Sequence, residues 1–167
     1  MRPPRFRNDT GAAMDVPFKM LVSVVLVSMA VATLYPVLQS YHETQMEHRV
    51  SLAVTEIEAA VTSAHRHPGS SRTVLIDVPS TGGIRLESLT IGSELTAPAV
   101  EAGAITWRLS SGPGSRELVT TSGGPVPMAG PGGEQVVIDR FPCLLVVEAM
   151  TAPPGVQHRD FVQVTVL

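Results

Sequence analysis

An almost unbroken apolar run over residues 20–38 constrains this chain more than any other feature of its sequence. About 20 helical residues at about 1.5 Å rise each cross a hydrocarbon layer of about 30 Å, so the run has the length of a membrane-spanning helix. Three arginines precede it, while His42, Glu43 and Glu47 follow it. By the positive-inside rule, this asymmetry predicts a cytoplasmic amino terminus and an extracellular remainder.

The helical pattern continues past the apolar run and becomes amphipathic. Between residues 41 and 64, apolar residues recur at helical spacing on one face, namely Met46, Val50, Ala53, Ile57, Ala60, Val61 and Ala64. Asp15 is a suitable N-cap, and Pro68-Gly69 is a stop signal. The sequence therefore predicts a basic leader over residues 1–14 and one helix over residues 15–67, with a bend at Pro36.

After residue 69 the apolar period changes from that of a helix to that of a strand. Ile105, Trp107 and Leu109 alternate with polar residues, and Gly- and Pro-containing turns separate the segments. The strands expected from this pattern are residues 72–78, 83–91, 104–109, 116–121, 134–139, 143–149 and 161–167. The predicted fold class is α+β, in which the long helix precedes a small antiparallel β-sandwich-like head over residues 70–167.

Charge and composition exclude several kinds of partner. The 12 basic and 15 acidic residues give a formal net charge of −3, whereas a nucleic-acid binder needs a basic surface. Cys143 is the single cysteine, so the chain forms neither an internal disulfide nor a cysteine-based metal site. We expect no nucleic-acid partner and no cofactor.

The candidate catalytic features each have a simpler interpretation. The glycine-rich segment 122–133 lacks a following helix and a lysine, so we interpret it as a flexible loop rather than a phosphate-binding loop. His65 and His67 point apart on a helix and match cationic residues at a helix carboxyl end. Cys143 and Trp107 lie on apolar strands and are expected in the core. The sequence predicts no enzyme and no metal site.

The order of features at the amino terminus is similar to that of a known superfamily. An arginine-rich leader, the Gly11-Ala12 junction, Asp15, the apolar helix that becomes amphipathic and the β-rich head follow one another. This organisation resembles the type IV pilins, and in particular the archaeal pilin-like and archaellum-component proteins with class III signal peptides.

The resemblance implies a structural subunit of a surface filament. A prepilin peptidase would cut between Gly11 and Ala12, and the apolar half-helix would then leave the membrane lipid and self-associate in the filament core. Asp15 would pair with the new amine of Ala12 in a neighbouring subunit. Asp15 and Lys19, spaced as i and i+4, would also neutralise each other at the helix mouth.

Two alternatives remain open on the sequence. In the first, the helix is an uncleaved signal anchor that displays the head outside the cell as a binding module. In the second, the chain is a secreted domain, because Ala30-Val31-Ala32 matches an A-x-A cleavage site after an apolar segment. The amphipathic extension after Tyr41 disfavours both. An anchor usually passes into a flexible linker, and the amphipathic helix would begin awkwardly after cleavage at Thr33.

Overall fold

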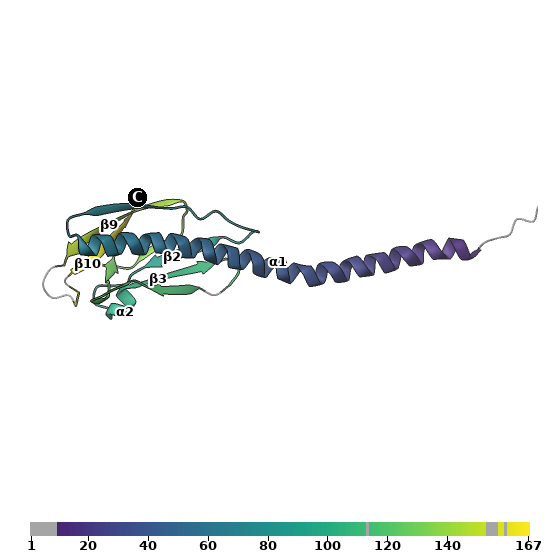
Figure 1. Cartoon of the computed structure of the whole chain (residues 1–167), viewed down its shortest axis with the longest axis horizontal. Helices are drawn as coiled ribbons and strands as arrows, with labels where there is room; N and C mark the ends of the chain where they lie inside the picture. The colour runs from purple at the N-terminus through teal and green to yellow at the C-terminus, as the bar shows by residue number, and fades with distance from the viewer. Residues whose placement is uncertain (1–9, 113, 153–156, 159) are drawn as a thin grey trace, which may run out of the picture. The chain divides into compact units, whose positions relative to one another are not determined.

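The computed structural model describes residues 10–112, 114–152, 157–158 and 160–167, with side chains from Val16 onward (Figure 1). The chain forms two compact units, residues 1–41 and 42–167. In its described part, the first unit is helical throughout. The second unit, which we call the head, contains the rest of that helix and all the strands. This is the α+β organisation that the sequence predicts.

The long helix α1 extends from Thr10 to Arg66. It therefore begins before the predicted start, and Asp15 lies inside the helix rather than at its N-cap. Both Pro17 and Pro36 lie within α1. The helix ends where the sequence predicts: His65 and Arg66 occupy its last turn, and Gly69 follows with a φ of 86°. Residues 1–9 of the expected leader lie outside the described residues, and residues 10–14 belong to α1.

Two four-stranded sheets make up most of the head. The first sheet has the order β1–β9–β10–β7, formed by Ser71–Ile76, Cys143–Thr151, Asp160–Val166 and Met128–Ala129. The second has the order β4–β3–β2–β8, formed by Ser115–Leu118, Ala104–Leu109, Leu86–Ile91 and Val136–Ile138. A two-stranded ribbon joins β5 (Thr120–Thr121) to β6 (Gly124–Pro125), and a short helix α2 spans Ala99–Ala102.

Two expectations about the strands need correction. The pairing of β7 with β10 is parallel, whereas every other pairing described between strands is antiparallel. Segment 122–133 is also not a free loop: it contributes β6 and β7, and Val126, Met128 and Ala129 are buried. A short apolar stretch between glycines carries too few residues for a visible alternation, so its burial depends on tertiary contacts.

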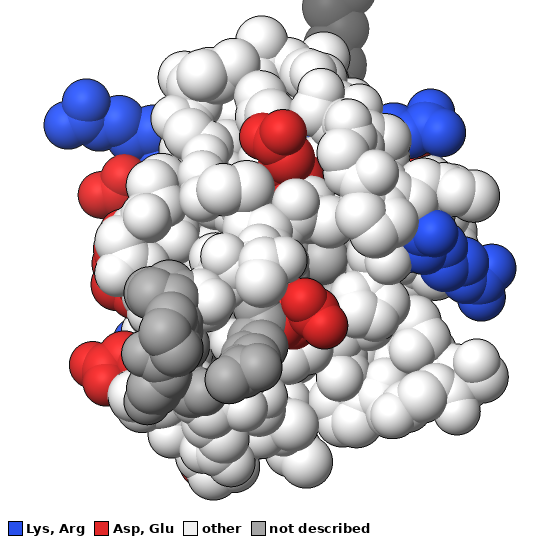
Figure 2. Space-filling view, turned by 90° about the vertical axis from the view of Figure 1, so that its left-hand side faces the viewer, with Lys and Arg blue, Asp and Glu red and all other residues white. Residues whose placement is uncertain are grey.

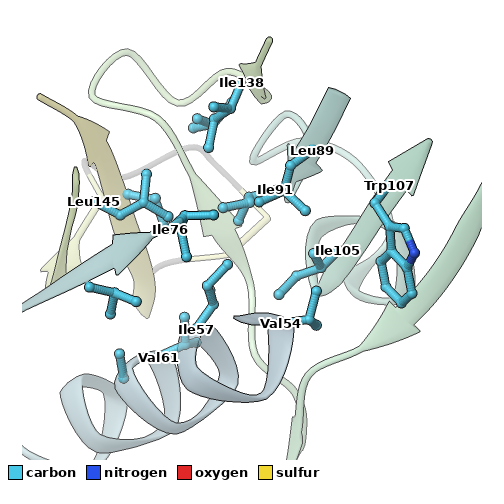
Figure 3. Packing of buried hydrophobic residues seen from close by; sticks show 14 of the residues in the cluster. Val54, Ile57, Val61, Ile76, Leu89, Ile91, Ile105, Trp107, Ile138 and Leu145 are labelled. Carbon is cyan, nitrogen blue, oxygen red and sulfur yellow. The ribbon is translucent and has the colours of Figure 1, made fainter. Parts of the chain in front are cut away.

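One hydrophobic core joins the helix to both sheets. Val54, Ile57 and Val61 of α1 point toward strand residues such as Ile76 and Ile105 (Figure 3). The predicted helical stripe is confirmed, since Met46, Val50, Ile57, Ala60, Val61 and Ala64 are all buried and Ala53 is partly buried. Val54 is also buried, although the predicted stripe did not include it. The carboxyl half of α1 therefore supplies the surface on which both sheets pack.

Gly92, directly after β2, lies in close backbone contact with Ala104 and Met128. Its amide donates a hydrogen bond to the carbonyl of Ala104 at 2.8 Å, and its φ is 67°. A Cβ at this position would collide with the carbonyl oxygen of Met128. Backbone groups cannot move aside as a flexible side chain can, so only glycine fits here.

We expect Gly92→Ala to destabilise the head by roughly 3 kcal/mol or more, because it combines a left-handed backbone with a backbone clash. Gly83→Ala is the matched control, since Gly83 has a φ of 83° and open space around it. That change should cost only about 1 kcal/mol from the backbone term. Urea unfolding followed by fluorescence of the single tryptophan, Trp107, measures both. Equal costs for the two variants would contradict the close contact at Gly92.

Glu58 of α1 has an unfavourable environment at neutral pH. It is half-buried, and desolvation by burial raises the pKa of its carboxyl, with a smaller contribution from the charge of Glu117 on β4. The folded-state pKa therefore lies above the ordinary value of 4.5. Consequently the protonated form favours folding, and this stability is present below pH 4.5 and is lost as the pH rises through the folded-state pKa.

Glu58→Gln should therefore raise the free energy of unfolding at pH 7 by roughly 0.5 kcal/mol, because it removes a charge that is only partly screened by water. The gain should vanish below about pH 4.5, where Glu58 of the unchanged chain is protonated in both states. Glu56→Gln, at an exposed position on the same helix, is the control and should have little effect. A gain that persists unchanged at pH 4 would contradict this account. Thermal melts across pH measure the difference.

Candidate assembly or membrane surface

The amino-terminal part of α1 exposes its apolar side chains on every side. From Val16 to Tyr41, every described residue is exposed, and the large apolar side chains range from 39% exposed at Val22 to 67% at Met20 and Tyr35. In the head half of the same helix, the buried stripe is at most 8% exposed. We call residues 16–41 the exposed apolar segment. Water is a poor solvent for such a surface, so it requires lipid or protein around it.

The hydroxyl groups of the exposed apolar segment are satisfied within the helix itself. Ser23 Oγ donates to the carbonyl oxygen of Lys19 at 2.9 Å, and Thr33 Oγ1 donates to those of Met29 and Ala30 at 3.1 and 2.9 Å. These polar groups therefore need no water in order to be hydrogen bonded. By length and composition, α1 is long and apolar enough to cross a membrane near the amino terminus.

The structure tests the predicted processing and assembly residues only in part. Gly11, Ala12 and Asp15 lie in the helical backbone of α1, but their side chains lie outside the described residues. Lys19 is described and is exposed, one turn along the helix from Asp15. Cleavage at Gly11, pairing of Asp15 with a neighbouring amine and neutralisation of Asp15 by Lys19 remain predictions.

Two candidate reactive residues of the head are core residues, as expected. Cys143 is buried, and burial raises the pKa of its thiol, which keeps it protonated and weakly nucleophilic. Trp107 is 8% exposed and belongs to the main core. Among the described residues, no three His, Cys, Asp or Glu side chains come together as a metal site, and this includes His65 and His67.

The head also has a cleft that the sequence did not indicate. It has a volume of about 630 Å³ and lies where β9 and β10 meet the segments around Leu95 and Gly132. Its lining combines apolar Phe161 with the carboxylates of Glu94 and Glu134. A Cβ at Gly132 would collide with the Glu134 carboxylate, so the glycines leave room for that side chain over the loop. The glycine-rich segment therefore forms part of the cleft wall, against which the Glu134 side chain packs.

Charges are spread over the end of the head rather than gathered in one place. Figure 2 shows that, on this face, the Lys and Arg side chains project separately at the edges of the outline. Acidic side chains lie among a mainly uncharged surface in the same view. The described part of this face therefore offers no continuous basic patch to a nucleic-acid backbone.

These features define a class of protein: a β-rich head built on the carboxyl half of a helix whose amino half is apolar and exposed. Neither a family model, nor a curated protein, nor a solved structure matches the chain. The exposed apolar segment and the buried stripe of α1 are therefore the features that bear on function.

Proposed function

We propose that this protein is a structural subunit of a type IV pilus-like or archaellum-like surface filament. Its apolar helix would first lie in the membrane and then, after cleavage between Gly11 and Ala12 by a prepilin peptidase, pack against the helices of other copies. In this proposal the head lies outside the cell on the filament surface. In the filament, contacts with the helices of other copies would replace lipid around the exposed apolar segment.

One observation carries the proposal: α1 continues without a break from the exposed apolar segment into the core of the head. In a pilin-like subunit the amphipathic half of this helix is the spine of the head, and here that half carries the buried stripe. A display module on a simple anchor commonly follows a flexible linker instead.

The proposal also agrees with the chemistry of the exposed apolar segment. Valines and alanines present short side chains, and the internally bonded hydroxyls of Ser23 and Thr33 add no polar surface that needs water. Helices with such surfaces approach one another closely, with interaxial distances of about 8–10 Å. Packing and dispersion contacts would then hold the subunits together.

The alternative function is an uncleaved single-pass signal anchor that displays the head as an extracellular binding module. The cleft of about 630 Å³ favours this alternative, because it has the size and mixed lining of many ligand sites. The two functions differ in whether the exposed apolar segment meets other copies or only lipid.

A cysteine in the exposed apolar segment tests this difference. Cys143 is buried, so the introduced thiol of Val25→Cys would be the accessible one in this chain. Under mild oxidation we expect disulfide-linked dimers in material sheared from the cell surface. Close packing of the helices of different copies would bring introduced thiols to the Cβ separation of about 3.5–4.5 Å that a disulfide needs. Non-reducing gel electrophoresis measures the linked fraction.

Leu52→Cys provides the matched control. Leu52 lies on the same helix within the head and is 56% exposed, but it is outside the exposed apolar segment. We expect few or no dimers from this variant. If Val25→Cys remains monomeric in the membrane, with none in the sheared material, the anchor alternative replaces the filament proposal.

A further inference from the structure

A small hollow on the second sheet combines two arginines with several hydroxyl groups. It has a volume of about 240 Å³ and lies over β2, β3 and β4. The polar side chains on the outer sheet face that lines it are Arg108 and Arg116 together with the hydroxyls of Ser88, Thr90 and Thr106. Among the described residues, no carboxylate lines it, although the chain as a whole is acidic. We call this the arginine hollow.

The register of the sheet places the two arginines next to each other. Thr106 on β3 pairs with Arg116 on β4, while Arg108 lies two residues further along β3 and pairs with Ser88 on β2. Residues two apart on a strand share a face, so Arg108 and Arg116 are diagonal neighbours. Long side chains at such positions reach one another's surroundings.

These two positive charges lack an opposite charge. Neither guanidinium forms an ion pair with a described residue. Arg116 Nη2 donates to the carbonyl oxygen of Val100 at 2.8 Å, a bond that fixes one edge of the group and leaves its other donors available. Like charges on one sheet face repel, so a bound anion would stabilise this arrangement.

The hydroxyl groups of the arginine hollow are also available. Within the described chain, no side-chain hydrogen bond engages the hydroxyls of Ser88, Thr90 or Thr106. At the edge of the hollow, Gly114 lies close to the backbone of β3, because a Cβ there would lie 2.6 Å from the carbonyl oxygen of Trp107. The donors themselves stand on paired strands, so a ligand would need to order little of the backbone around it.

We propose that the arginine hollow binds a single oxyanion group, either a phosphate or a carboxylate, carried by a sugar. Guanidinium groups form strong charge-assisted hydrogen bonds with such oxyanions, and neighbouring hydroxyls suit the sugar oxygens. A ligand of this kind would be an acidic or phosphorylated surface saccharide. The inference concerns the head alone and does not depend on filament assembly.

Titration of the full ¹⁵N-labelled chain tests the proposal, in micelles of a zwitterionic amine-oxide detergent whose headgroup contains neither sugar nor phosphate. The probes are glucose 6-phosphate and glucuronate, with glucose as the neutral control, at physiological salt to suppress weak ion binding. We expect saturable amide shifts at Thr106–Arg108 and Ser115–Arg116 with one or both acids and none with glucose. The acid that binds more tightly identifies phosphate or carboxylate as the preferred group.

Matched variants separate a site from general ion attraction. Arg108→Gln and Arg116→Gln should each weaken binding roughly tenfold or more, because each removes charge-assisted hydrogen bonds. Arg72→Gln, at an exposed position on β1 outside the hollow, should leave the affinity unchanged. Retained signal dispersion confirms that each variant is folded. Equal shifts with glucose, no saturable shifts with either acid, or an equal loss in Arg72→Gln would overturn the proposal.

Discussion

The head depends on the burial of one stripe of α1 against the inner faces of two sheets. Each four-stranded sheet has one apolar face, and such a face must be buried against another element. Ile57 and Val61 are fully buried by strand residues that come from both sheets, such as Ile105 and Leu145. The helix is thus a shared partner of both sheets, which also meet each other directly where Gly92 lies against the backbone of Met128.

The same helix has opposite surroundings along its length. Its carboxyl half loses its apolar stripe to the core, whereas its amino half keeps Leu26, Val27 and their neighbours exposed. A soluble domain does not retain so large an apolar surface, so this half is made for lipid or for other protein chains. This contrast within one element is the physical basis of the proposed filament role.

The sequence predicted the parts of the fold that repeat with a regular period. The long helix, its stop after Arg66 and the alternating strand around Trp107 all follow from local patterns. By contrast, the parallel pairing of β7 with β10 covers two residue pairs and has no local signal in the sequence. The burial of Met128 likewise depends on segments distant in sequence, such as Gly92.

Candidate sites were predictable to different degrees. Gly11, Asp15 and Lys19 were found from their order along the chain, and the described structure leaves their roles as proposals. The arginine hollow could not be found from sequence, because Arg108 and Arg116 become neighbours only through the register of β3 with β4. The cleft beside Glu134 likewise requires four separated segments to meet.

The central claim is that the apolar half of α1 leaves the membrane after cleavage and packs among other copies. The intact mass of the protein recovered from its native envelope tests this most directly, because it identifies the first residue of the mature chain. The account predicts a chain that begins at Ala12. A chain that begins at Met1, or one that begins near Thr33, would contradict it.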